Sequence, residues 1–133
     1  MKKVIVLLFI FIGLFAFSQD VNWESYKEID GIIIQKGNIE CNNNELLTFE
    51  IENTNSYQVV ISWYEEVWVN DVCKQNGQSQ EHYREAILNP GETIRGDCTF
   101  QESFYIGFNI TRGNRTLSLT HFDLNNIVVQ KAK

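Results

Sequence analysis

Hydrophobic and polar residues alternate with a period of two along much of this chain. In a β-strand successive side chains point to opposite faces, so this alternation predicts strands with one face in a core and the other in water. Segment 46–53 is a clear case, and its inward face is predicted to carry Leu47, Phe49 and Ile51. The polar residues between them are predicted to face water, and they are Thr48, Glu50 and Glu52.

The same pattern predicts about seven strands, at 31–36, 46–53, 58–70, 81–88, 93–96, 104–110 and 117–129. Segment 79–88 is ambiguous. Tyr83 and Ile87 lie four positions apart, as in a short helix, whereas the Asn89-Pro90-Gly91-Glu92 turn that follows favours a strand. No segment has a sustained apolar period of about 3.6 residues. We therefore expect an all-β fold, a single antiparallel β-sandwich.

The predicted strand 58–70 has large side chains on both faces. One face carries Val59, Ile61 and Trp63. The opposite face carries Ser62, Tyr64, Glu66 and Trp68. The alternation blurs near Glu65, as it would at a β-bulge. In segment 104–110 the residues predicted to face the core are Phe104, Ile106, Phe108 and Ile110.

The first 18 residues have the features of a secretory signal peptide. A basic start is followed by an uncharged, mostly apolar run over residues 4–17, and Ala16-Phe17-Ser18 supplies the small residues of a cleavage site before Gln19. The apolar run is shorter than the about 20 residues of a membrane-spanning helix. We therefore expect a signal peptide at 1–18 and a sandwich domain at 19–133. The domain should be secreted or periplasmic, with no membrane insertion after cleavage.

Composition and charge exclude several classes of protein. With 44% hydrophobic residues and one proline, the chain is neither disordered nor fibrous. Its 17 acidic residues outnumber 11 basic ones and give a net charge of −6. Loss of Lys2 and Lys3 with the signal peptide would change −6 to −8. Such acidity argues against nucleic acid and leaves an unknown protein or glycan as the expected partner.

The three cysteines are Cys41, Cys73 and Cys98, and all lie in the part predicted to be exported. Export exposes them to an oxidising compartment, so one disulfide and one remaining thiol are expected. If successive strands run up and down, all three lie in connections at one end of the sandwich, so any two could meet. A zinc site is disfavoured, because no C-x₂-C pair is present and neither His82 nor His121 has a ligand spacing to the cysteines.

Several motifs occur together in this chain. They are the Ala16-Phe17-Ser18 ending before Gln19-Asp20, the strand 46–53 closing on Asn53-Thr54-Asn55, the Trp63 strand and the Asn89-Pro90-Gly91-Glu92 turn. Together they resemble small exported immunoglobulin-like β-sandwich proteins of Bacteroidetes bacteria, over most of residues 26–130. The resemblance implies an immunoglobulin-like fold and carries no catalytic residue over to this chain.

In an immunoglobulin-like strand order the second and fifth predicted strands are neighbours. This order favours a Cys41–Cys98 disulfide and leaves Cys73 as the free thiol. The third and sixth strands would also be neighbours, so Cys73–Cys98 remains open as the alternative.

No residues in the chain have the spacing of a catalytic or cofactor site. Glu50 and Glu52 share a strand face at a separation compatible with glycoside hydrolysis on distance alone, but we expect them to belong simply to a solvated strand face. His82 and His121 lie outside any Ser/His/Asp or Cys/His signature, and no phosphate-binding loop or EF-hand pattern occurs. We therefore expect no enzyme, no cofactor and no metal.

The best candidate ligand site is the face of strand 58–70 that carries Tyr64, Glu66 and Trp68. Uncovered aromatic rings stack on sugars and on extended peptides. The rings could instead pack beneath a loop or beneath residues 23–26. We expect a secreted, non-catalytic β-sandwich with a binding or structural role at the cell surface or in the periplasm. The alternatives are a carbohydrate-binding module that uses this face and, less favoured, a small secreted hydrolase.

Overall fold

The structure is a computed structural model that describes residues 20–98, 105–112 and 114–133, without the side chains of 105–112. The predicted signal peptide and the predicted inward side chains of 104–110 therefore lie outside the described residues. Within the described residues, no helix has both the length and the apolar character needed to cross a membrane.

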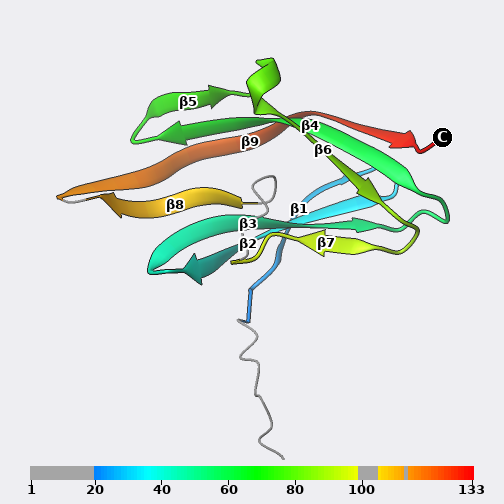
Figure 1. Cartoon of the computed structure of the whole chain (residues 1–133), viewed down its shortest axis with the longest axis horizontal. Helices are drawn as coiled ribbons and strands as arrows, with labels where there is room; N and C mark the ends of the chain where they lie inside the picture. Colours follow the sequence, from blue (N-terminus) through cyan, green and yellow to red (C-terminus); the bar gives the residue numbers. More distant parts are fainter. Residues whose placement is uncertain (1–19, 99–104, 113) are drawn as a thin grey trace, which may run out of the picture.

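The described chain forms two antiparallel sheets that lie one over the other (Figure 1). The elements are β1 (Glu24–Ile29), β2 (Ile32–Cys41), β3 (Asn44–Asn53), β4 (Val59–Val69), β5 (Val72–Asn76), the 3₁₀ helix η1 (Gln80–His82), β6 (Tyr83–Leu88), β7 (Thr93–Arg95), β8 (Tyr105–Arg112) and β9 (Arg115–Lys131). The predicted all-β antiparallel sandwich is confirmed.

Strand β9 belongs to both sheets. Its first residues, 115–118, pair with β8 in the first sheet, which also contains β1, β2, β3 and β7. Residues 119–131 pair with β4 in the second sheet, where β5 and β6 share the other edge of β4. The strand order is β1-β2-β3-β8-β9-β4-β5, with β6 beside β4 and β7 beside β3.

The described residues form nine strands rather than about seven, because β1 and β5 are additional. Both pair with a neighbour through tight turns whose two central residues have positive φ, the geometry of hairpin turns that Asn, Asp and Gly adopt most readily. These turns are Asp30-Gly31 and Asn70-Asp71, and Asn42-Asn43 forms a third turn of the same kind between β2 and β3. The Asn42-Asn43 turn also extends β2 to Cys41, so this cysteine ends a strand rather than lying in a long connection.

The strand neighbours follow the immunoglobulin-like expectation only in part. The second and fifth predicted strands are neighbours, since Glu50, Ile51 and Glu52 of β3 pair with β7. The third and sixth are not paired, because β9 lies between β4 and β8. In segment 79–88 the favoured strand is present, but it begins at Tyr83 after η1 rather than at residue 81.

The Cys41–Cys98 disulfide favoured by the sequence is present, with a Cα separation of 5.5 Å. Cys73 lies on β5 in the second sheet and is a free, exposed thiol, so the alternative Cys73–Cys98 pairing does not occur. The disulfide ties the end of β2 to the chain that follows β7. A small apolar cluster of Ile39, Cys41 and Leu46 lies beside it on the outer face of the first sheet.

The main core lies between the two sheets. Its buried residues include the predicted inward residues of both sheets, namely Leu47, Phe49, Ile51, Val59, Ile61 and Trp63. Thr48 points away from this core as predicted, but it is fully buried rather than in water. The reason is that the chain after β7 covers the outer face there, where Thr48 Oγ1 donates a hydrogen bond of 2.7 Å to the carbonyl of Gly96.

The inward face of β4 also carries a carboxylate. The alternation of β4 continues through Glu65, which is only 3% exposed, so the expected irregularity is a charged residue at an inward position rather than a bulge in β4. Glu65 Oε2 lies 3.3 Å from Arg84, and Oε1 has no hydrogen-bond partner among the described residues. Burial raises the pKa of Glu65 to about 7, although the nearby charge of Arg84 acts in the opposite direction.

The disulfide should contribute strongly to stability, since it closes a loop of 57 residues. We expect the Cys41→Ser/Cys98→Ser double variant to lower the free energy of unfolding by about 2–5 kcal/mol in urea titrations. Cys73→Ser is the matched control and should change it by less than about 0.5 kcal/mol. Thiol counting on denatured, unreduced protein should find only the Cys73 thiol; three reactive thiols would contradict the pairing.

Glu65 should make stability depend on pH. Between its ordinary pKa of 4.5 and about 7, the folded protein holds a proton that the unfolded chain has released. This stabilising contribution is present below pH 4.5 and is lost as the pH rises through about 7. As the pH rises from 4.5 to about 7, the free energy of unfolding of Glu65→Gln should therefore increase by up to about 3 kcal/mol relative to that of the unsubstituted protein.

Urea titrations at several pH values measure this difference. Glu50→Gln is the control for loss of a carboxylate as such, since Glu50 pairs with Arg95 at 3.0 Å on the outer side of the first sheet. A difference between Glu65→Gln and the unsubstituted protein that stays constant from pH 4.5 to about pH 8 would contradict the assignment.

Candidate functional site

The structure places all three predicted ligand-binding residues on one surface. Tyr64, Glu66 and Trp68 are half-buried and alternate along β4 with inward residues. We call this surface, formed by the outward side chains of β4, β6 and β9, the outer face of the second sheet. Residues from β6 and β9 join the three through strand pairing, since Tyr64 is opposite both Tyr83 and Asn125, and Trp68 is opposite His121.

Glu66 is the centre of the polar end of this face. Its Oε1 accepts a hydrogen bond of 2.9 Å from the indole Nε1 of Trp68, and its Oε2 accepts one of 2.8 Å from Asn125. His121 Nε2 lies 3.6 Å from Oε1. Both carboxylate oxygens are therefore engaged, and the Trp68 ring is held in one orientation.

These contacts set the charge of Glu66. The hydrogen bonds from Asn125 and then Trp68 lower its pKa, because both stabilise the ionised carboxylate. The group is an anion at neutral pH and acts as a hydrogen-bond acceptor that its neighbours already fix in place. It is therefore suited to positioning a ligand and poorly suited to donating a proton.

A pair of tyrosines forms the middle of the face. The rings of Tyr64 and Tyr83 have centroids 5.4 Å apart and planes inclined at 66°, an edge-to-face arrangement. The Tyr83 hydroxyl donates a hydrogen bond of 2.7 Å to Glu85, and this bond raises the pKa of Tyr83. Two rings in this arrangement do not form one flat platform.

Among the described residues, a loop covers this face at one edge. Residues 23–26 do not pack over it: Tyr26 contacts Phe49 and Phe122, at ring separations of 6.0 and 5.6 Å. The connection after β5 does reach it, because Gly77 lies so close to Glu66 and Asn125 that a side chain there would collide with both. The covering loop was among the expected alternatives, and it shields Glu66 from one side.

The apolar end of this face lies outside the predicted site residues. Val60 is opposite Ile87, and Ser62 is opposite Val128, so the aliphatic side chains share the outer face with the tyrosines. Ile87 is 59% exposed and Val128 is 44% exposed. The signal available in the sequence was a run of apolar residues at both odd and even positions, which places some of them outward in any strand.

The described residues contain no cluster of three or more His, Cys, Asp or Glu side chains that could hold a metal ion. Elsewhere, Glu50 pairs with Arg95, and His82 is buried with its Nδ1 accepting a hydrogen bond from the backbone of Asn76. The outer face presents aromatic rings, aliphatic side chains and fixed polar groups, which are suited to binding.

Comparisons with known proteins give no relative of this chain. No protein-family model matches it, and neither the curated proteins nor the solved structures contain a significant match.

The hydrogen bonds to Glu66 can be tested by titration. Asn125→Ala removes the largest contribution, so the pKa of Glu66 should rise towards its ordinary value. Trp68→Phe should raise it by a smaller amount. NMR titration of the Glu66 carboxyl carbon measures both changes, with Gln130→Ala on the same strand as the control. An unchanged midpoint in Asn125→Ala would contradict the arrangement.

Proposed function

We propose that this protein is an exported, non-catalytic binding domain that holds a protein partner on the outer face of the second sheet. Export is supported by the signal-like residues 1–18 and by the Cys41–Cys98 disulfide, since disulfides persist in oxidising compartments. The resemblance to exported immunoglobulin-like proteins remains a hypothesis about the origin of the chain, and the proposed binding role does not rest on it.

The exposed aliphatic end of the face carries the proposal. The outward positions of a solvated antiparallel sheet are ordinarily polar. Here Val60, Ile87 and Val128 occupy adjoining outward positions. Ile87 is 59% exposed and Val128 is 44% exposed. Adjoining exposed apolar side chains are typical of protein interaction sites.

The rest of the face has the composition of an interface. Tyr64, Tyr83 and Trp68 continue the aliphatic end, and aromatic residues are enriched where proteins bind each other. Glu66, held by Trp68 and Asn125, supplies a fixed acceptor at the border. A central apolar region with polar groups beside it is the usual organisation of such surfaces.

A carbohydrate-binding module is the second candidate. The observation in its favour is the Trp68 indole, which Glu66 holds in one orientation beside His121. Stacking of a sugar on a fixed indole with polar groups next to it is a common mode of recognition. The edge-to-face tyrosines limit any such platform to the Trp68 end.

The protein-binding hypothesis predicts a specific loss. The purified protein is immobilised and exposed to envelope extracts and culture fluid of the source organism. Mass spectrometry then quantifies the proteins that it retains. Ile87→Ser/Val128→Ser should lower retention of the specific partner at least about tenfold, because each apolar side chain buried contributes about 1.5–3 kcal/mol. Glu50→Gln, on the first sheet, should retain it unchanged.

A glycan array with tryptophan fluorescence separates the second candidate from the first. Binding of a glycan that Trp68→Ala abolishes and Ile87→Ser/Val128→Ser leaves intact would favour the carbohydrate reading. Partner retention that is the same for the double variant and the unsubstituted protein would contradict docking on the aliphatic end.

A further inference from the structure

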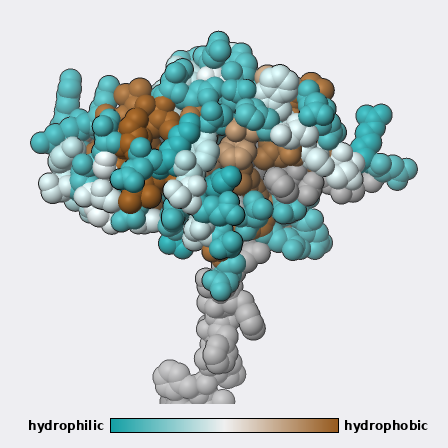
Figure 2. Space-filling view, turned by 180° about the vertical axis from the view of Figure 1, so that it is seen from behind, coloured by the Kyte–Doolittle hydropathy of each residue, from teal (hydrophilic) through white to brown (hydrophobic). Residues whose placement is uncertain are grey.

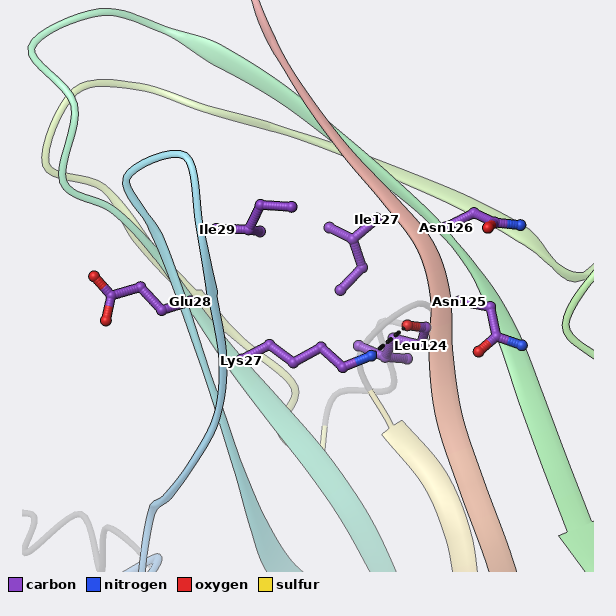
Figure 3. Close-up of a pocket in the computed structure, with 7 residues that line it drawn as sticks. All are labelled: Lys27, Glu28, Ile29, Leu124, Asn125, Asn126 and Ile127. Atoms are coloured by element: carbon purple, nitrogen blue, oxygen red, sulfur yellow. Dashed lines mark hydrogen bonds between the residues drawn. The ribbon is translucent and has the colours of Figure 1, made fainter.

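Two strand edges face each other across an opening on a different side of the molecule (Figure 3). Among the described residues, β1 pairs only with β2, and β9 beyond residue 118 pairs only with β4. A strand that is paired on one edge presents alternate N–H and C=O groups on its other edge. We call the opening between these edges of β1 and β9 the β1–β9 groove.

Side chains of β1 take the place of a neighbouring strand at one end of the groove. The Leu124 amide donates a hydrogen bond of 3.0 Å to the hydroxyl of Tyr26, and the Leu124 carbonyl accepts one of 2.8 Å from Lys27. Tyr26 and Lys27 also donate to Asp123. These contacts show that the backbone edge of β9 is turned towards β1 and takes hydrogen bonds from that side.

Beyond Leu124 the two edges separate. The groove there has a volume of about 560 Å³, within the range of ligand-binding pockets. Ile29 and Ile127 point into the opening from opposite strands, and the stem of Lys27 forms one end (Figure 3). On this side of the molecule the space-filling view shows a hydrophobic patch bordered by hydrophilic residues (Figure 2).

Two exposed acidic residues lie beside the groove. Glu28 lines it on β1, with its carboxylate on the side of β1 away from the opening (Figure 3), and Asp30 follows in the next turn. Neither has an ion-pair partner in the described part of the chain, whereas Lys27, the basic residue among those lining the groove, is already paired with Asp123 at 2.8 Å. The carboxylates beside the groove favour a positively charged ligand over a negatively charged one.

We propose that the β1–β9 groove binds an extended peptide segment that adds as a strand between β1 and β9. An aliphatic side chain of the peptide would lie between Ile29 and Ile127, and flanking Lys or Arg residues would lie near Glu28 and Asp30. An extended peptide is the ligand that can satisfy two facing strand edges at once, since its backbone has donors and acceptors on both sides. A sugar or a small apolar molecule would use the isoleucines and leave the edges unpaired.

The proposal can be tested with peptides of defined backbone chemistry. The probe is a fluorescein-labelled heptapeptide of alternating lysine and valine, measured by fluorescence anisotropy against the purified protein. The first comparison peptide has N-methyl groups on alternate amides, and the second replaces lysine by glutamate. We expect the unmodified basic peptide to bind at least tenfold more tightly than either. Equal binding of the N-methylated peptide would overturn strand addition, and no binding of the basic peptide would overturn the site.

Variants locate the binding and separate it from the proposed protein-binding face. Ile127→Ser should weaken peptide binding at least tenfold, whereas Val128→Ser, the next residue on β9 but on the outer face, should leave it unchanged. Glu28→Gln/Asp30→Asn keeps the groove and the fold and should weaken binding severalfold while reducing its salt dependence. Equal losses for Ile127→Ser and Val128→Ser, or no effect of the charge variant, would contradict the groove. A variant that loses the retained partner but still binds the peptide has lost the function of the outer face, and the groove proposal stands.

Discussion

The pairing of β4 with β9 is the constraint on which the rest of the structure depends. β9 starts beside β8 in the first sheet and continues beside β4 in the second, so the backbone hydrogen bonds of one strand hold both layers together. β4 is paired on both edges and supplies Val59, Ile61 and Trp63 to the core. Because β9 changes partner along its length, no strand of the described residues pairs with its second edge beyond residue 118, and the β1–β9 groove is the result.

Strand alternation also separates two carboxylates that are adjacent in the chain. Glu65 points into the core, where loss of hydration raises its pKa to about 7. Glu66 points outward, where hydrogen bonds from Asn125 and Trp68 lower its pKa. The same residue type is thus a neutral-range titrating group on one face of β4 and a fixed anion on the other. The difference arises from burial and hydrogen bonding, not from sequence neighbours.

The sequence was most informative where strands are half-buried. Segments 46–53 and 58–70 have strong alternation, and β3 and β4 are found there with the predicted faces inward. Edge strands β1 and β5 have little apolar alternation because they contribute little to the core, and only the turn residues beside them, such as Asn70-Asp71, indicate them. Burial of Thr48 could not be predicted, since it depends on a distant segment that the disulfide holds nearby.

The candidate site shows the same division. Local alternation suffices to place Tyr64, Glu66 and Trp68 on one face, because they belong to a single strand. Two other contacts of Glu66, Asn125 and His121, come from β9, about sixty positions away, and the pattern along one strand carries no information on that pairing. In the sequence Ile87 fits either a helix or a strand period, and its exposure on the outer face follows from the pairing of β6 with β4.

The buried Glu65 has one more consequence, for the protein as a population. The formal net charge of −6 counts this carboxyl as ionised. Because burial raises its pKa to about 7, this carboxyl is only partly ionised at neutral pH. A chemically homogeneous sample is then a mixture of two protonation states that differ by one unit of charge and exchange through a core residue. Any ligand or surface that binds one protonation state of Glu65 more tightly than the other would shift their ratio.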